Sequence, residues 1–286
     1  MFPFIHIGSF SLGTFGLFMW LAGVAGVIVL QRNLSRNVIK ADAVVIVATS
    51  LILGILGAKL WHELQQPVEF GHELRAIVSP GWSHPVNILL NFLQWFRAGF
   101  AWFGGLLFGV GALLWQGRSL KIGALRMLDL AAPAAAIGYG IGRIGCLTSG
   151  DGDYGINTTH LWGVHIKDDA LDPPVPNPPG LLVEPTPVYE LLFGLALGAY
   201  LWIRGRKRLP IGQVTGEYLV LSGVGRFLIE FLRRNERLYL GMTNAQVAAL
   251  LTILIGGLLI LYAKRRGDVP YSPAMGSSEP AEPAAA

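Results

Sequence analysis

Residues 128–147 read LDLAAPAAAIGYGIGRIGCL, an apolar stretch of membrane-spanning length. Near its end lies Arg143, whose guanidinium group stays charged at any physiological pH. Placing that charge at membrane depth costs at least about 2.5–3.5 kcal/mol, so such a residue indicates a functional site. Its planar fork of donors suits an oxyanion such as phosphate. The glycines around Arg143 let other groups approach the backbone closely.

The composition of the whole chain indicates a polytopic membrane protein. The 286 residues are 52% hydrophobic and 14% charged, whereas soluble domains average about 25% charged residues. The net charge is +4, and the basic residues lie mostly in short loops between apolar runs. This distribution is typical of residues that set the orientation of a membrane protein, and it argues against a nucleic-acid partner. The single cysteine, Cys146, excludes an internal disulfide, and the six histidines have no metal-ligand spacing. We therefore expect neither a metal nor another cofactor.

Seven apolar stretches are candidates for membrane-spanning helices and predict an all-α fold. They cover residues 11–30, 41–61, 99–116, 128–147, 187–203, 211–232 and 244–263. Three of the segments that join them, and the stretch after the last one, each carry three or four Lys or Arg: 31–40, 117–127, 204–210 and 264–266. Basic loops stay on the cytoplasmic side, which places the N-terminus outside and the C-terminus in the cytoplasm.

The remaining segments complete one transmembrane domain over residues 1–267. Residues 62–98 and 148–186 are two sizeable outer segments, and connections of this length often border a functional site. Residues 268–286 are rich in Pro, Ala, Glu and Ser, which predicts a disordered cytoplasmic tail.

Three cations fall within predicted spans, and the orientation places Lys59, Arg143 and Arg226 in the outer half of the membrane. Glu230 follows Arg226 by four residues and shares its helix face, and Arg233 extends that face by a turn. Glu230 can hold the guanidinium group or act as a carboxylate in its own right. Several cations at this depth favour a lipid phosphate over a transport path, which would place its charges near the midplane.

Each of these features also has a purely structural interpretation. Arg143 and Lys59 could extend their charged ends to the membrane surface, and Arg226 with Glu230 could form a stabilising ion pair. The glycines of the stretch 99–105 could serve close helix packing, and Cys146 could be an inert small residue.

Four short motifs occur in order along the chain: Phe103-Gly-Gly-Leu106, Gly142-Arg143-Ile-Gly-Cys-Leu-Thr-Ser-Gly-Asp151, Glu184-Pro-Thr-Pro-Val-Tyr-Glu190 and Gly225-Arg226-Phe-Leu-Ile-Glu230-Phe-Leu-Arg233. They resemble the motifs H-G-G-L, G-R-x-G-N-F-x-N-G-E, H-P-S/T-Q-L-Y-E and F-R-x-x-x-E-x-x-R of the prolipoprotein diacylglyceryl transferases. Phe15-Gly16-Leu17 resembles an early Y-G-L of the same family. The resemblance covers nearly the whole chain and implies a seven-span protein of the bacterial cytoplasmic membrane.

The resemblance implies transfer of a diacylglyceryl group from phosphatidylglycerol to a cysteine thiol in the lipobox of a lipoprotein precursor. The expected partners are therefore phosphatidylglycerol, other membrane lipids and this precursor. No nucleic acid is expected as a partner. Arg143 and Arg226 match family arginines that stabilise the departing phosphate, and Glu230 would orient Arg226. Further residues are candidates for substrate binding: Asp151, which replaces a family glutamate, and Gly104, Gly105, Arg233, Tyr189, Lys59 and Cys146.

The chain departs from the family motifs at several polar positions. Phe103 replaces a histidine, Cys146 and Ser149 replace asparagines, and Glu184 replaces a second histidine. A histidine could accept the proton of a thiol, whose free pKa is about 8.5, and Phe103 cannot. The departures indicate a divergent paralogue.

Three functions follow as alternatives. The first is an active transferase in which Glu230, Asp151, Glu184 or His84 takes the thiol proton, or in which no strong base is needed. The second is a non-catalytic membrane subunit that binds phospholipid. The third is a transferase of the same fold with another acceptor, in which Cys146 near Arg143 is the nucleophile, because cations lower the pKa of a thiol.

Overall fold

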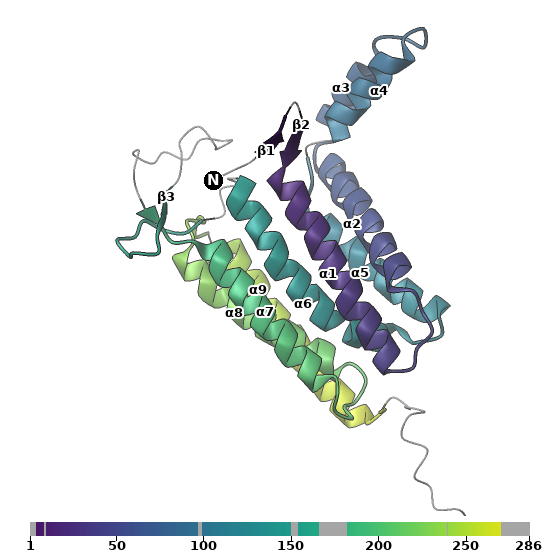
Figure 1. Cartoon of the computed structure of the whole chain (residues 1–286), viewed down its shortest axis with the longest axis vertical. Helices are drawn as coiled ribbons and strands as arrows, with labels where there is room; N and C mark the ends of the chain where they lie inside the picture. Colours follow the sequence, from purple (N-terminus) through teal and green to yellow (C-terminus); the bar gives the residue numbers. More distant parts are fainter. Residues whose placement is uncertain are drawn as a thin grey trace, which may run out of the picture. The chain divides into compact units, whose positions relative to one another are not determined.

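The structure is a computed structural model that describes residues 4–8, 10–96, 99–149, 154–165, 182–238 and 240–269 (Figure 1). Most of these residues are helical, as the sequence predicts. The helices are α1 (Thr14–Arg36), α2 (Ala43–Gln65), α3 (Pro67–Val78), α4 (Pro85–Phe96), α5 (Trp102–Ser119), α6 (Ala124–Ser149), α7 (Thr186–Arg204), α8 (Gln213–Ile229), the short 3₁₀ helix η2 (Glu230–Leu232) and α9 (Asn244–Arg266). Two antiparallel strand pairs join β1 (Phe4–Ile7) to β2 (Phe10–Gly13) and β3 (Val164–His165) to β4 (Leu182–Val183).

Five helices of the described residues are long and apolar enough to cross a membrane: α1, α2, α6, α7 and α9. The chain is therefore an all-α protein with apolar helices of membrane-spanning length. α5 and α8 coincide with the other two predicted spans, 99–116 and 211–232, but they are not among the five helices that are long and apolar enough to cross a membrane. α8 has 17 residues, and the 18 residues of α5 end in the polar sequence Gln-Gly-Arg-Ser.

Three helices extend further at their basic ends than the apolar stretches predict. α1 continues to Arg36, α5 to Ser119 and α9 to Arg266. Basic side chains near a helix C-terminus interact favourably with the helix dipole, and their long stems carry the charge toward polar surroundings. The helical backbone therefore continues past the last apolar residue, where hydropathy alone places a loop.

The chain divides into two compact units, of which the first joins residues 1–43 to residues 125–286 and the second covers residues 44–124. The sequence predicts one domain over residues 1–267, and this division lies within it. Most of the predicted tail, residues 270–286, lies outside the described residues, as does much of the outer segment 148–186.

In the first unit, α6, α7 and α8 share an apolar core. Its buried members are Ala132, Ala136, Leu197, Leu201 and Val214. α6 and α7 approach each other closely, because a Cβ atom at Gly194 would lie 2.8 Å from the carbonyl oxygen of Ala136 and 2.9 Å from the Cα atom of Gly140. Such close packing through small residues is typical of helices in membranes.

Asp129 links α6 to α8 at the end of the unit opposite to Gly140. Its carboxylate accepts hydrogen bonds from the backbone N–H groups of Gly212, at 2.6 Å, and Thr215, at 2.7 Å. The Thr215 hydroxyl also donates to it at 2.6 Å. Free N–H groups at a helix start favour a carboxylate, so Asp129 fixes the beginning of α8 against α6.

In the second unit, α2 packs against α5, and α3 and α4 form a pair beyond the end of α2 (Figure 1). A Cβ atom at Gly104 would collide with the carbonyl oxygen of Gly57, so this glycine allows the contact between α5 and α2. α3 and α4 have 12 residues each and occupy most of the predicted outer segment 62–98. They are too short to span a membrane, as predicted.

Candidate functional site

An ion pair between α6 and α7 forms the centre of the site. Arg143 lies one turn after Gly140 on α6, and Glu190 lies one turn before Gly194 on α7, so the close packing of the two glycines brings the charged side chains together. The Nε atom of Arg143 donates to Oε2 of Glu190 at 2.6 Å, and its Nη2 atom lies 2.5 Å from the same oxygen. Both side chains are nearly buried, with exposed fractions of 12% and 5%.

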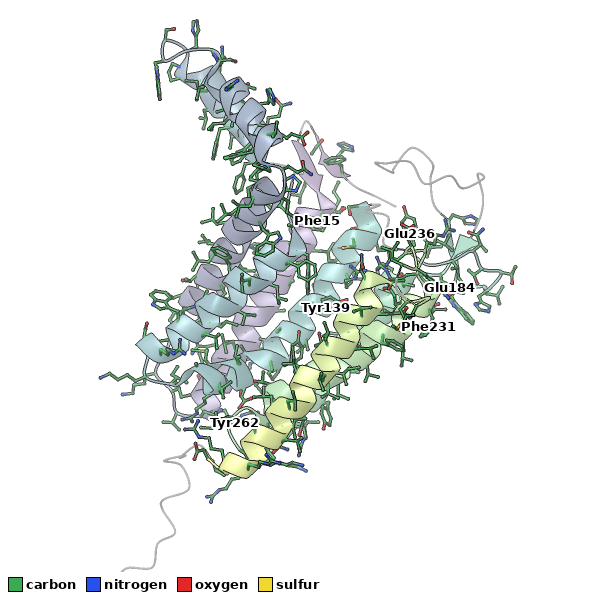
Figure 2. The ribbon with its side chains drawn as sticks, turned by 180° about the vertical axis from the view of Figure 1, so that it is seen from behind. Phe15, Tyr139, Glu184, Phe231, Glu236 and Tyr262 are labelled. Atoms are coloured by element: carbon green, nitrogen blue, oxygen red, sulfur yellow. The ribbon has the colours of Figure 1, made fainter. Side chains whose placement is uncertain are left out.

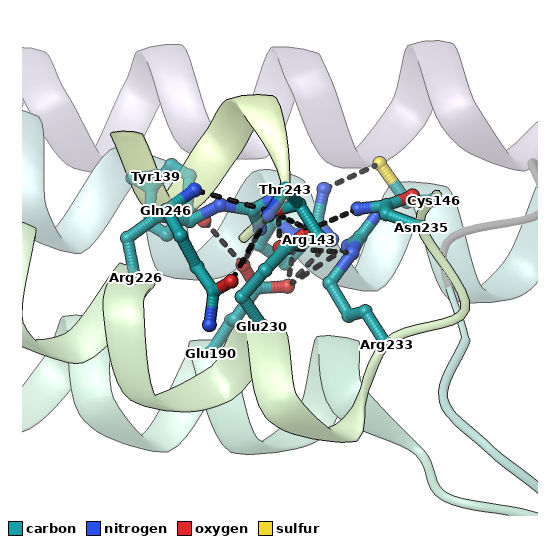
Figure 3. Close-up of polar contacts among 10 residues, drawn as sticks. All are labelled: Tyr139, Arg143, Cys146, Glu190, Arg226, Glu230, Arg233, Asn235, Thr243 and Gln246. Carbon is teal, nitrogen blue, oxygen red and sulfur yellow. Dashed lines mark hydrogen bonds and ion pairs between the residues drawn. The ribbon is translucent and has the colours of Figure 1, made fainter. Parts of the chain in front are cut away.

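Two further arginines, one near the end of α8 and one directly after η2, complete the cluster (Figure 3). Arg226 donates to Oε1 of Glu190 at 3.1 Å and pairs with Oε2 of Glu230 at 2.8 Å, which confirms that Arg226 and Glu230 share a helix face. Arg233 lies 3.9 Å from Glu190 and 3.7 Å from Glu230, measured between nitrogen and carboxylate oxygen. We call Arg143, Glu190, Arg226, Glu230 and Arg233 the arginine cluster.

The start of α9 holds Glu230 in place. The Thr243 hydroxyl donates to Oε1 of Glu230 at 2.9 Å, and Asn235 donates to the same oxygen. Thr243 also caps α9, because its side chain accepts a hydrogen bond from the backbone N–H of Gln246 at 3.1 Å, and the Gln246 side chain accepts one from the backbone N–H of Thr243 at 3.0 Å. Glu230 is 2% exposed, so it is a buried partner of Arg226 and Arg233.

Tyr139 and Cys146 extend the cluster along α6. Tyr139 precedes Arg143 by one turn, and its hydroxyl donates to Oε1 of Glu190 at 2.6 Å. Cys146 follows Arg143 by one turn, and its sulfur lies 3.6 Å from Nη1 of the guanidinium group. The structure thus confirms that the thiol lies beside a cation.

The arginine cluster has the charge of an anion-binding site. Three guanidinium groups face two carboxylates, which leaves an excess of one positive charge at the cluster. Arg226 has the largest exposed fraction of the three, 29%, so its donors are the most accessible to a ligand. Arginine forks bind phosphate and carboxylate oxygens in pairs. Within the described residues, no group of three His, Cys, Asp or Glu side chains could hold a metal ion.

Three predicted site residues belong to the second unit: Lys59, Gly104 and Gly105. Lys59 is 5% exposed, pairs with Glu63 at 2.7 Å and donates to the backbone oxygen of Trp95 at 3.0 Å. It lines a cavity of about 670 Å³ together with His62, Glu73 and Trp95. Gly104 allows α5 to pack closely against α2, in agreement with the structural interpretation of the glycines in the stretch 99–105.

Of the other two predicted residues, Tyr189 lies outside the arginine cluster. Asp151 lies outside the described residues. The hydroxyl of Tyr189 donates to Glu184 at 2.5 Å, whereas the next residue, Glu190, contacts the arginines. The sequence predicts Tyr189 as a site residue, whereas its neighbour Glu190 lies at the centre of the cluster.

Glu184, which occupies a family histidine position, is buried at the start of α7. Burial raises the pKa of a carboxyl group, but hydrogen bonds from Thr158, Tyr189 and His160 outweigh it and hold the pKa of Glu184 below its usual range. Glu184 is therefore ionised near neutral pH and a poor proton acceptor by itself.

Sequence reasoning missed Glu190 and Tyr139 as members of the site. The signal for Glu190 was present, because it is a carboxylate in the apolar stretch of α7, and the cost of such a charge had already singled out Arg143. Tyr139 has no comparable signal, since an uncharged tyrosine within a span does not carry the cost of a charge.

The comparisons with known proteins all point to the same family. The model of the family described as prolipoprotein diacylglyceryl transferase matches residues 3–262. A phosphatidylglycerol–prolipoprotein diacylglyceryl transferase of Pseudoalteromonas atlantica is 31% identical over 96% of this chain and 94% of its own length. One of Streptococcus suis is 28% identical over 93% of this chain and 94% of its own length. A protein of Clostridium perfringens with this name and the number 2 is 33% identical over 58% of this chain and 62% of its own length.

Proposed function

Because the chain belongs to the prolipoprotein diacylglyceryl transferase family, we propose that it moves the diacylglyceryl group of phosphatidylglycerol to the cysteine thiol of a lipoprotein precursor. The chain is a transferase of this family. The observation that carries the proposal is the convergence of Arg143, Arg226 and Arg233 on the buried Glu190. Such a cluster binds the phosphate of the lipid.

The reaction needs this positive charge. The thiolate attacks the glycerol carbon that carries the phosphate ester, and negative charge grows on the phosphate as the carbon–oxygen bond breaks. Guanidinium donors that are already aimed at the phosphate stabilise this charge without further reorganisation. Arg143 and Arg226 would supply these donors, while Glu190 and Glu230 fix their directions and Arg233 adds to the potential.

We place the arginine cluster at the outer side of the bacterial cytoplasmic membrane, with seven spans, an outer N-terminus and a cytoplasmic C-terminus. The position of basic residues supports this orientation. In the first unit, the arginine cluster lies at the C-terminal end of α6. Arg36 and Arg204 are the last residues of α1 and α7 and lie at the other end of the unit. Lys and Arg concentrate on the cytoplasmic side of membrane proteins.

The remaining sequence candidates stay proposals for substrate binding. Asp151 follows Arg143 in the same motif and would contact the polar part of the lipid. Gly104 and Gly105 belong to the motif that resembles the family's H-G-G-L, and Lys59 is a cation within a predicted span. Tyr189 supports Glu184. The losses at Phe103 and Cys146 mark the chain as a divergent paralogue.

A second candidate function rests on the contact between Arg143 and Cys146 at 3.6 Å. A nearby guanidinium group lowers the pKa of a thiol and increases the thiolate fraction. In a transferase with another acceptor, the Cys146 thiolate would attack the glycerol carbon of the lipid, and glycerol phosphate would leave with the electron pair of the broken carbon–oxygen bond.

One assay separates these functions. The purified full-length protein is given phosphatidylglycerol labelled in its head-group glycerol, with and without a lipobox peptide that contains one cysteine. The transferase function predicts peptide-dependent release of glycerol phosphate, which Arg143→Ala abolishes and Arg126→Ala, on the same helix away from the cluster, leaves intact. Lipid binding without release contradicts it. Release without peptide that is lost in Cys146→Ser supports the second candidate.

A further inference from the structure

A histidine that no family motif includes forms a dyad with Glu184. Nδ1 of His160 lies 2.7 Å from Oε1 of Glu184, and the hydroxyl of Tyr189 donates to the other carboxylate oxygen at 2.5 Å. The imidazole ring stacks on Trp162, with 4.6 Å between the ring centroids and 30° between the planes. The His160 side chain is 55% exposed and that of Glu184 is 7% exposed. The carboxylate is thus fixed in the protein while the imidazole remains accessible.

The backbone around the dyad is joined to the arginine cluster by hydrogen bonds. Gly155 donates to the Glu184 carbonyl at 2.8 Å, and Glu184 donates back to Ile156 at 3.0 Å. Ile156 in turn donates to the Leu232 carbonyl at 2.8 Å, and Gly155 forms a bridge with Arg233. The segment 154–158 therefore lies between the start of α7 and η2, the two elements that carry Glu190 and Glu230.

The segment has little freedom to move away. A Cβ atom at Gly155 would lie 2.5 Å from the Leu232 oxygen and 2.7 Å from Cβ of Glu184, so the backbone is packed on both sides. Arg234 adds hydrogen bonds to the Gly155 carbonyl, at 2.9 Å, and to the side chain of Asn157. Figure 2 shows Glu184 at the same end of the helices as Tyr139 and Phe231, away from Tyr262.

The geometry of the dyad suits proton transfer. An imidazole that donates its Nδ1–H to a carboxylate presents the lone pair of Nε2 as a proton acceptor. The carboxylate fixes the ring tautomer and stabilises the imidazolium ion that forms, as in catalytic triads. Among the residues that the structure describes, the charged and titratable groups that face the dyad segment are Glu184, Tyr189, Arg233 and Arg234.

Of the other proton acceptors that the sequence suggests, Asp151 lies outside the described residues, and Glu230 and His84 fit less well. Glu230 is buried and paired with arginines. His84 is an exposed residue of the second unit that contacts Ser83 and the backbone of Pro80. Phe103 has no ionisable group.

We propose that Nε2 of His160 is the proton acceptor of the transfer reaction and that Glu184 is its positioning residue. This inference rests on the proposed function. The thiol proton passes to Nε2 as the sulfur forms its bond to the glycerol carbon. The carbon–oxygen bond to the phosphate breaks, its electron pair stays on the phosphate oxygen, and glycerol phosphate leaves. The imidazolium ion then returns its proton to water.

The test measures kcat/KM for glycerol phosphate release between pH 5 and 9, with the full-length protein, phosphatidylglycerol vesicles and a cysteine-containing lipobox peptide. Loss of a general base typically lowers the rate about 10²–10⁴-fold, so His160→Gln should show this loss at neutral pH. The ionisation on the acidic side of the pH profile should disappear in the variant. Phosphatidylglycerol binding should not change. His165→Gln, which alters an exposed histidine on the nearby strand β3, should retain the wild-type profile.

A second measurement separates proton transfer from a structural role. A peptide with selenocysteine at the acceptor position is ionised at neutral pH and needs no proton acceptor, so it should restore turnover of His160→Gln to near that of the wild type with the same peptide. Wild-type pH dependence in His160→Gln, or no rescue by the selenol, overturns the role of His160 and leaves the transferase function standing. No release by the wild-type protein overturns both.

Discussion

Glu190 on α7 and Arg143 on α6 form a nearly buried ion pair, in which Nε and Nη2 of the guanidinium group lie 2.6 Å and 2.5 Å from the same carboxylate oxygen. A buried charge is tolerated when a partner compensates it, and removal of one partner leaves the other uncompensated. The pair fixes the direction of the guanidinium group before any lipid arrives. Preorganised donors of this kind are what a developing phosphate charge requires.

Glu190→Gln should separate lipid binding from turnover. The substitution keeps the shape of the side chain but removes one of the two carboxylates that face three guanidinium groups. We expect phosphatidylglycerol binding to be retained or strengthened, because the excess positive charge grows. We expect kcat to fall by about 10²–10³-fold, because the arginines lose their fixed directions.

The matched control for this prediction is Glu217→Gln, which removes a carboxylate paired with Arg204 at the other end of α7 and α8. Steady-state kinetics and lipid binding of the two variants should differ as described. Equal effects of both substitutions on kcat would show that Glu190 acts only through general stability.

Gly194→Ala should weaken the contact between α6 and α7. The new Cβ atom would lie 2.8 Å from the Ala136 oxygen, and overpacking of this kind typically costs about 1–3 kcal/mol. The displacement separates Arg143 from Glu190, so activity should fall together with the thermal midpoint. Gly257→Ala in α9, where a Cβ atom meets nothing within 4 Å, should change neither property. Similar results for the two variants would argue against glycine packing as the cause of the ion pair.

Thr243→Ala should destabilise the start of α9 and release Glu230. The residue caps the helix and donates to Glu230 at 2.9 Å, and loss of a cap alone costs about 0.5–2 kcal/mol. Thr243→Ser keeps the hydroxyl group and should behave as the wild type. Thermal unfolding in detergent checks the stability, and the lipid-transfer assay checks whether Arg226 loses its orientation; an alanine variant with normal stability contradicts the assigned role of the cap.

Glu184 should make the stability of the protein depend on pH in the acidic range. Hydrogen bonds hold its folded pKa below the usual range of a glutamate, so the ionised form stabilises the folded state fully above the pKa of the unfolded chain. The stabilisation is lost as the pH falls through the lower folded pKa. The thermal midpoint of the wild type should therefore drop between about pH 5 and 3 more than that of Glu184→Gln. Parallel curves for the two proteins would contradict this prediction.

The sequence predicts the helices and the main cations of the site because both follow from local chemistry. Apolar stretches of sufficient length indicate membrane helices, and a charge within one indicates a functional site. The pairing of Arg226 with Glu230 follows from helical periodicity alone. α1, α5 and α9 end later than the apolar stretches predict, since a helix with basic residues continues beyond its apolar stretch.

The partners contributed by distant segments could not be predicted in the same way. The contact of Glu190 with Arg143 depends on the approach of α6 to α7, and the support of Glu230 by Thr243 depends on where α9 begins. His160 lies in a segment without periodicity, and its contact with Glu184 depends on a short ladder of backbone hydrogen bonds. These relationships are tertiary, and no spacing in the sequence encodes them.

The most direct test of the central claim is the single-turnover rate of glycerol phosphate release from phosphatidylglycerol in Arg226→Ala, compared with Arg204→Ala. Arg226 is the most exposed member of the arginine cluster, whereas Arg204 pairs with Glu217 at the far end of the unit. If the cluster stabilises the departing phosphate, the rate falls by about 10²–10³-fold in Arg226→Ala and stays near the wild-type value in Arg204→Ala. An unchanged rate in Arg226→Ala would contradict the account.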